Sequence, residues 1–239
     1  DGVVTLAWTM DHVAPLAGTV TDAALMLDAM LGGSSALAWT DDPITGTHVG
    51  VPTATLEGAE PGVARVIDEG FAALAACGAI VDMVERPTGA DLDLANAAGL
   101  VISRCEAAAL HREHGLDRGV YWDVVREQLA RAEDIRAIDY LDAQRARAAL
   151  RDRLIGCFAE HDVLAMPTVP VVAPLVEDFA AHLMVLARNA IPWSLVGFPA
   201  ISVPAGTVDG LPVGMQFVAP PGGEATLVRV ALAFEAANR

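Results

Sequence analysis

The chain has 239 residues, of which 54% are hydrophobic and 19% are charged. This length can bury a sizeable core, and the hydrophobic content excludes a disordered chain. Acidic residues outnumber basic residues 31 to 15, which gives a formal net charge of −16. Such an acidic surface repels phosphate backbones, so we expect no direct binding of nucleic acid. We also expect no membrane interaction, because no run of about 18 apolar residues occurs.

All fifteen basic side chains are arginines, because the sequence contains no lysine. A Schiff base, a P-loop and a lysine general base each require the lysine amine. These three kinds of chemistry are therefore excluded for this polypeptide acting alone.

The start of the chain and its cysteines indicate its cellular context. The first residue is Asp1, and the residues after it lack the charged start and apolar centre of a signal peptide. We expect the chain to begin within a longer polypeptide. Cys77, Cys105 and Cys157 show no paired spacing, and each lies among apolar residues. They are typical of buried free thiols in a reducing compartment, so we expect a cytoplasmic protein.

The N-terminal third predicts one βαβ unit preceded by a helix. Thr19 and Pro61 are typical helix starts, and Gly78 is a typical helix stop. Strand, helix and strand in succession predict a parallel pair of strands. The expected elements are a helix that Thr19 caps, with Asp22 at its third position, and that runs to Met30, a strand over 48–52, a helix over 61–77 and a strand over 79–84.

The rest of the chain is mostly helical at first and then alternates strands with turns. Five apolar residues are expected to form the buried stripe of the last long helix before residue 160: Ile138, Leu141, Leu150, Leu154 and Phe158. Strands are expected over 162–166, 199–204 and 212–218, with a turn at 208–210 and a closing helix over 224–237. We predict a single α/β domain over residues 1–239, a mixed sheet flanked by helices on both faces.

Three local patterns could carry chemistry, but each favours a structural role. Gly32–Ser35 follows a helix end, so a C-cap and loop are favoured over an anion cradle. His111 and His114 could bind a metal, but Glu106 is not spaced to be the third ligand. Asp11 and His12 are adjacent, so their side chains point apart in an extended segment. The residues alone show no complete catalytic apparatus, and we expect no metal and no cofactor.

Three motifs in chain order point to one family. Residues 11–25 read DHVAPLAGTVTDAAL, residues 162–170 read DVLAMPTVP, and residues 197–216 contain GFPAISVPAG and GLPVGMQ. These segments resemble the amidase signature enzymes, which hydrolyse carbon–nitrogen bonds. The sequence departs from the family pattern at Ala14, usually Gly, and at Gly18, usually Arg. Residues 189–194 read NAIPWS where the family often has NTRPFN.

The resemblance implies a catalytic triad that this chain lacks. In the family, a serine nucleophile is deprotonated by a neutral lysine through a second, bridging serine. All three lie before the first of the motifs above, so we expect no catalytic residue in this chain. We expect a partial amidase fold that supplies sheet and substrate wall, with the upstream segment or a second copy of the chain as its partner.

The resemblance also suggests which residues contact a small amide substrate. Thr168 leaves a strand at its carboxyl end, where open α/β sheets bind ligands. Trp193 and Phe198 could line an apolar acyl pocket, although Trp193 fits a core position equally well. Two other functions stay open: a non-catalytic binding or scaffold module with this fold, and an amidotransferase subunit that works with partner chains.

Overall fold

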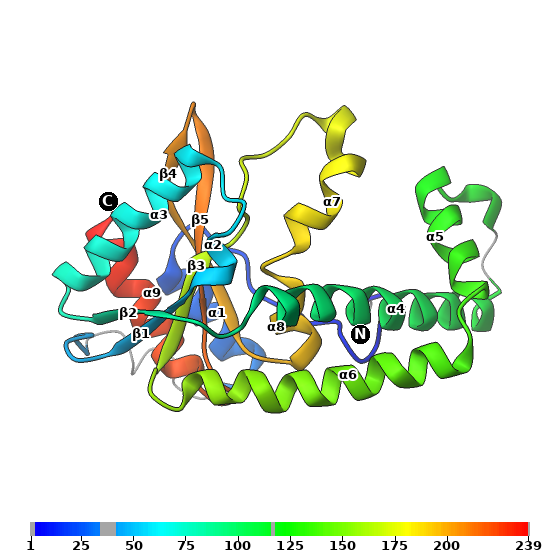
Figure 1. The fold of residues 1–239 in the computed structure, drawn as a ribbon, viewed down its shortest axis with the longest axis horizontal. Coiled ribbons are helices and arrows are strands. Elements are labelled where there is room, and N and C mark those ends of the chain that lie inside the picture. Colours follow the sequence, from blue (N-terminus) through cyan, green and yellow to red (C-terminus); the bar gives the residue numbers. More distant parts are fainter. Residues whose placement is uncertain (1–2, 34–41, 116–117, 239) are drawn as a thin grey trace.

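The computed structural model describes residues 3–33, 42–115 and 118–238. Its described strands form one mixed sheet in the order β2-β1-β3-β5-β4 (Figure 1). β1 is parallel to both of its neighbours, whereas β5 is antiparallel to β3 and β4. The strands are β1 His48–Pro52, β2 Ile80–Val84, β3 Val163–Pro167, β4 Ala200–Val208 and β5 Leu211–Val218.

Helices occupy most of the remaining described residues. The α-helices are α1 Val20–Met30, α2 Thr53–Leu56, α3 Pro61–Ala76, α4 Gly89–Glu113, α5 Asp123–Glu133, α6 Ala137–Ile155, α7 Phe179–Ala187, α8 Ile191–Val196 and α9 Glu224–Ala237. Short 3-10 turns cover Arg118–Val120, Gly156–Phe158 and Val176–Asp178.

The predicted helix boundaries are confirmed where local chemistry sets them. The Thr19 side chain accepts a hydrogen bond from the Asp22 amide at 3.0 Å and caps α1. Pro61 occupies the first position of α3, and Gly78 follows that helix with a φ of +92°. The positive φ favours glycine, which is why the helix ends there.

The predicted strand pairings are confirmed as well. β1 and β2 flank α3 and run parallel, with His48 opposite Ile80. β4 and β5 form a hairpin whose turn contains Asp209 and Gly210, both at positive φ. β4 lies at an edge of the described sheet, and Pro204 adjoins a register irregularity there, where a missing amide is tolerated.

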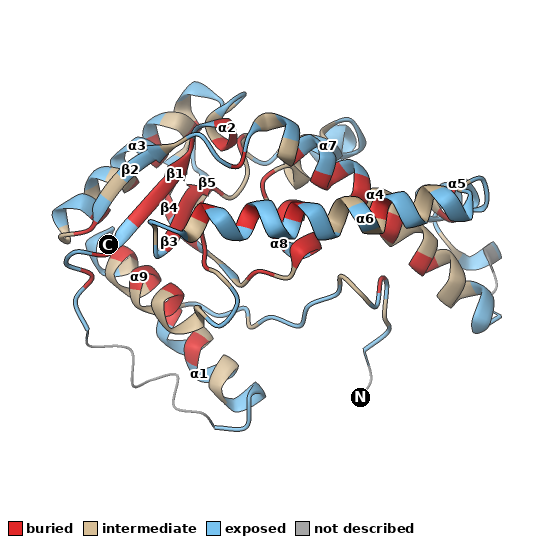
Figure 2. Ribbon diagram, turned by 60° about the horizontal axis from the view of Figure 1, so that its bottom comes forward, coloured by how far each residue is buried: buried red, intermediate tan, exposed pale blue. Residues whose placement is uncertain are grey.

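Helices cover both faces of the sheet, as predicted. Alternate residues of β3 point to opposite faces, because side chains alternate along a strand. Val163 and Ala165 join a core that includes α1, α3 and α9. Leu164 and Met166 join a second core that includes α4, α6 and α8. Figure 2 shows the buried strands between these two helical layers.

The predicted stripe of the long helix is correct only in its second half. Leu150 and Leu154 are buried in α6, but Ile138 and Leu141 are 54% and 55% exposed. The first turns of α6 extend away from the sheet alongside α4 (Figure 1). Phe158 lies in the 3-10 turn after α6.

The cysteines are free thiols, as expected, but they differ in burial. Cys157 is buried, whereas Cys77 and Cys105 are half-buried. Of the helices in the described residues, none combines the length and apolar character needed to cross a membrane.

Candidate functional site

Two hydroxyl groups meet beside the carboxyl end of β3. Thr168 directly follows this strand, and its backbone amide donates to the Gly214 carbonyl oxygen at 2.8 Å. Its Oγ1 lies 2.6 Å from Oγ of Ser202, which β4 contributes. Thr168 is half-buried and Ser202 is exposed, so the pair borders solvent. Ligands of open α/β sheets bind at this end of the strands.

Gly214 of β5 makes room for this hydroxyl pair. A Cβ atom at this position would lie 2.8 Å from Ser202 Oγ and 2.8 Å from Thr168 Oγ1. Both separations are below van der Waals contact, so the two hydroxyls can meet only over a residue without a side chain. The second glycine of the GLPVG motif therefore has a steric role.

Hydrogen bonds of Asn189 join several elements around the end of β3. Its side chain is buried, and Nδ2 donates to the carbonyl oxygens of Thr55 and Pro167, each at 3.0 Å. Gln216 Nε2 donates to the Asn189 carbonyl oxygen at 2.9 Å. These bonds join α2, the end of β3, β5 and the approach to α8. Buried polar groups that are mutually bonded in this way fix local geometry.

The two aromatic residues proposed from the sequence lie in the second core. Trp193 is 1% exposed and Phe198 is 5% exposed. Their rings stack at 6.5 Å, and the Phe158 ring packs against Phe198 at 5.9 Å. The Arg151 guanidinium lies 5.6 Å from the centre of the Phe198 ring. Both side chains stabilise α8 and its surroundings, and their role in an acyl pocket stays a prediction.

Within the described residues, the hydroxyl pair is not hydrogen-bonded to a base. Of the hydrogen bonds found in the described part of the chain, none joins Thr168 or Ser202 to a histidine or a carboxylate. A hydroxyl becomes a good nucleophile only when an adjacent base removes its proton. The two hydroxyls can donate and accept hydrogen bonds, and no base bonded to them in the described residues activates either one.

The residues considered for a metal site serve structural roles. Glu106 is 1% exposed and accepts hydrogen bonds from Thr9, whose amide and hydroxyl lie at 3.0 and 2.7 Å, and from Tyr140 at 3.2 Å. His111 Nδ1 lies 2.6 Å from the Tyr121 hydroxyl. Within residues 3–33, 42–115 and 118–238, no three histidine, cysteine or acidic side chains are grouped to hold a metal ion.

The other early candidates also have local roles. The Asp11 carboxylate accepts hydrogen bonds from the amides of Leu6 and Ala7, at 2.7 and 3.1 Å. Gly32 and Gly33 follow α1 at positive φ, as a helix end requires. Ser34 and Ser35 lie outside the described residues.

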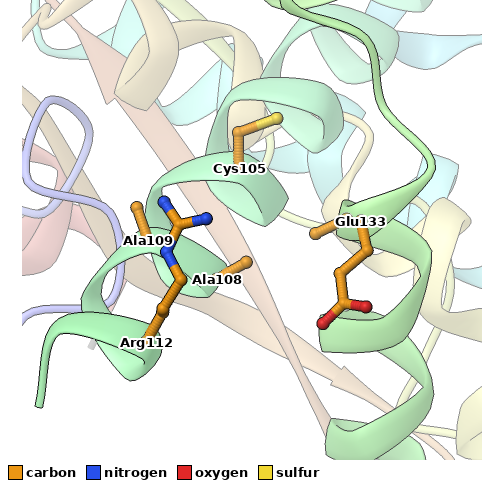
Figure 3. Close-up of a pocket in the computed structure, with 6 residues that line it drawn as sticks. Cys105, Ala108, Ala109, Arg112 and Glu133 are labelled. Carbon is orange, nitrogen blue, oxygen red and sulfur yellow. The ribbon is translucent and has the colours of Figure 1, made fainter. Parts of the chain in front are cut away.

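A cavity of about 190 Å³ lies between α4 and α5 (Figure 3). Cys105 and Arg112 of α4 and Glu133 of α5 are among the residues that line it. Burial raises the pKa of the Cys105 thiol, and the charge of Glu106 raises it further. The thiolate is therefore disfavoured, and this cysteine is a poor nucleophile.

Sequence reasoning identified Thr168 but missed its partners. Ser202 and Gly214 both lie within the quoted motifs, yet nothing in their spacing shows that they meet Thr168. Their contact depends on the register between β5 and its two neighbours, where Pro167 lies opposite Met215 and Ser202 lies opposite Gln216. Asn189 is the first residue of the NAIPWS segment. The resemblance of this segment to the family's NTRPFN is the only indication in the sequence that Asn189 has a role.

A mixed sheet between two helical layers defines an α/β protein, and polar side chains gather where β3 ends. The chain belongs to the Amidase family, whose sequence pattern matches residues 1–228. Of the residues that depart from the family motifs quoted above, Ala14, Gly18 and Ser194 are exposed, whereas Ala190 and Ile191 are half-buried and Trp193 is buried.

The similar proteins are longer than this chain. A glutamyl-tRNA(Gln) amidotransferase subunit from Halobacterium salinarum is 32% identical over 98% of this chain and 64% of its own length. The corresponding protein from an Exiguobacterium species is 32% identical over 99% of this chain and 57% of its own length. The chain therefore spans roughly three fifths of these curated relatives.

The solved structures that this chain resembles are also longer than it is. A crystal structure of an amidase superposes with a TM-score of 0.85 at 26% identity, over 100% of this chain and 56% of that one. The glutamyl-tRNA(Gln) amidotransferase subunit from Thermotoga maritima superposes with a TM-score of 0.76 at 26% identity, over 98% of this chain and 54% of that one. The α/β fold of this chain is the fold these proteins share.

Proposed function

We propose that this chain is part of an amide hydrolase, for which it supplies sheet and substrate wall while another segment supplies the nucleophile and the lysine. One observation carries the proposal: the sequence matches the Amidase family but contains no lysine. The family mechanism needs a neutral lysine amine to accept the proton of the nucleophilic serine. The hydroxyl pair at Thr168 is consistent with a substrate wall, because no histidine or carboxylate among the described residues is hydrogen-bonded to it.

The exposed N-terminal segment supports the need for a further segment. Residues 11–18 match a family motif, yet Leu16 is 94% exposed and Val13 is 70% exposed. Figure 2 shows this stretch lying apart from the helical layers. β4 is also an edge of the described sheet. Exposed apolar side chains and an open strand edge each favour association, with the upstream segment or with a second copy.

Within this proposal the wall residues contact the substrate. The hydroxyls of Thr168 and Ser202 border solvent at the strand ends and can bond to an amide oxygen or nitrogen. Trp193 and Phe198 support this wall through their packing in the core around α8. The substrate is a small amide, and the reaction releases an acid and an amine.

The test compares two forms of the protein on aryl and aliphatic amides. The 239-residue chain is expected to release no amine above the uncatalysed rate. A form extended by the sequence encoded upstream of Asp1 is expected to turn over, and to lose activity when its triad lysine is changed to alanine. Turnover by the 239-residue chain alone would refute the proposal.

A second candidate is a component of an amidotransferase, because several curated relatives carry that name at about 30% identity. The net charge of −16 opposes direct binding of RNA, so partner chains would have to hold it. Co-purification of the extended form with partner proteins, and transfer of ammonia rather than its release, would favour this candidate.

A further inference from the structure

The N-terminal segment, residues 3–18, is held where Thr9 bonds to both α4 and α6. Thr9 donates from its amide to Glu106 Oε2 at 3.0 Å and from its hydroxyl to Glu106 Oε1 at 2.7 Å. Arg147 donates from NH1 to the Thr9 hydroxyl oxygen at 2.8 Å and from NH2 to the Thr9 carbonyl oxygen at 2.6 Å. Every polar group of Thr9 is thus bonded to a charged side chain. We call this pair of residues, Glu106 and Arg147, the threonine slot.

The threonine slot is supported by the core behind it. Glu106 is 1% exposed, and its carboxylate also accepts a hydrogen bond from the Tyr140 hydroxyl at 3.2 Å. Buried groups that are bonded to one another in this way hold a fixed geometry. Next to the slot, Ala7 is 2% exposed and Met10 packs against the second core. The slot therefore recognises a short stretch of chain centred on a threonine.

The stretch that joins this anchor to α1 has few contacts. Among the described residues, no hydrogen bond is found for residues 12–18, and all of them except the half-buried Pro15 are exposed. Figure 2 shows this stretch running apart from the helices, between α1 and the end marked N. α1 packs in the first core, whereas Met10 packs against the second. Because the stretch has few contacts to lose, little free energy opposes its rearrangement.

We propose that the threonine slot also accepts Thr9 of a second copy of this chain, so that two chains associate by exchanging their N-terminal segments. The second copy fits because its Thr9 makes the same four hydrogen bonds that form within one chain. Exchange of an identical element is a low-cost route to a dimer. Residues 12–18 are the hinge of this exchange. It does not depend on the proposed function, because it requires neither a substrate nor a triad.

Within one chain, the N-terminal segment competes with the segment of a second copy. A short hinge holds it near its own slot at an effective concentration on the order of millimolar. Two variants remove this competition. Thr9→Pro lacks the amide N–H and the hydroxyl, so its own slot is left free. The double variant Glu106→Gln/Arg147→Met removes the carboxylate and the guanidinium together, so its segment is released and no lone charge stays at the slot.

The test mixes these two 239-residue variants after circular dichroism has shown that each is folded. Sedimentation velocity is expected to detect a species of two chains, in which the segment of the double variant occupies the slot of Thr9→Pro. The expected dissociation constant is on the order of 0.1 mM, as suits a contact of a few hydrogen bonds. Association in the mixture should be at least about tenfold tighter than in either variant alone, because neither has both a segment and a slot. If the double variant fails to fold, Glu106→Gln alone replaces it.

A control mixture locates the contact. Glu113→Gln/Arg145→Met makes the same two changes at exposed positions of α4 and α6 and keeps its slot intact. Mixed with Thr9→Pro, it is expected to associate at least about tenfold more weakly than the slot variant, because its segment stays in its own slot. Equal association in the two mixtures, or association in the test mixture no tighter than in the separate variants, would overturn the proposal.

Discussion

Thr168 Oγ1 and Ser202 Oγ, 34 residues apart in the sequence, lie 2.6 Å apart across Gly214. The contact joins the residue that follows β3 to the edge strand β4, although β5 runs between these strands. It is possible because Gly214 places no side chain between the hydroxyls. The hydroxyl pair is thus built from the end of β3 and from the β4–β5 hairpin, which lies further along the chain.

The hydroxyl contact predicts a measurable coupling between Thr168 and Ser202. In a double-mutant cycle of Thr168→Val and Ser202→Ala, the free energies of unfolding should show a coupling of about 0.5–1.5 kcal/mol, typical of one hydrogen bond. Urea denaturation of the four proteins measures it. The control cycle pairs Thr168→Val with Ser194→Ala, an exposed serine on α8, and should show additive effects. A coupling of zero at Ser202 would contradict the hydroxyl contact.

Gly214→Ala should destabilise the chain by about 1–3 kcal/mol, because the new Cβ would overlap both hydroxyl oxygens. The matched control is Gly156→Ala at the end of α6, where nothing lies within 4 Å and φ is helical. That change should leave the free energy of unfolding unchanged or raise it slightly. Equal changes in the free energy of unfolding for the two substitutions would contradict the steric role proposed for Gly214.

Local signals in the sequence predicted much of the fold. The capping threonine at 19, the glycine stop at 78 and the turn at 209–210 each depend on a few neighbouring residues, and each is found in the structure. The closing helix also has its expected bounds. The exposure of Ile138 and Leu141 could not be predicted, because it depends on how far α6 extends beyond the sheet.

Glu106→Gln should release the N-terminal segment. The buried carboxylate accepts three hydrogen bonds, two of them from Thr9, and the amide of glutamine offers only one acceptor oxygen. Loss of a bond to a buried charged group costs about 1.5–3 kcal/mol. Limited proteolysis should cut before residue 19 faster than in the unmodified chain. Glu113→Gln, at an exposed position on α4, should leave the cleavage rate unchanged. Equal cleavage rates for both variants would contradict the claim that Glu106 holds the N-terminal segment in place.

The stability of the chain should fall at alkaline pH in part because of Cys157. Burial raises the pKa of this thiol from its usual value near 9 to about 11. The folded state therefore favours the neutral thiol, and this contribution is complete below pH 9 and is lost as the pH rises towards 11. The difference in free energy of unfolding between the unmodified chain and Cys157→Ala, in the presence of reductant, should shrink over that interval. A difference that is constant or grows would contradict the raised pKa.

The candidate site was only partly visible in the sequence. Thr168 could be placed because it follows a predicted strand within a family motif. Asn189 and Gln216 could not be assigned roles, since their hydrogen bonds span 134 and 27 residues and depend on the packed structure. The burial of Trp193 follows likewise from the arrangement of α4, α6 and α8 against the sheet.

The central claim is that no hydroxyl of this chain is an activated nucleophile. Intact mass spectrometry of the folded 239-residue chain after treatment with a fluorophosphonate tests it directly, because such reagents form a covalent bond only with activated hydroxyls. We expect the mass of the chain to stay unchanged, while the extended form gains one adduct upstream of residue 1. An adduct on Ser202, Thr168 or any other hydroxyl of the 239-residue chain would contradict the account.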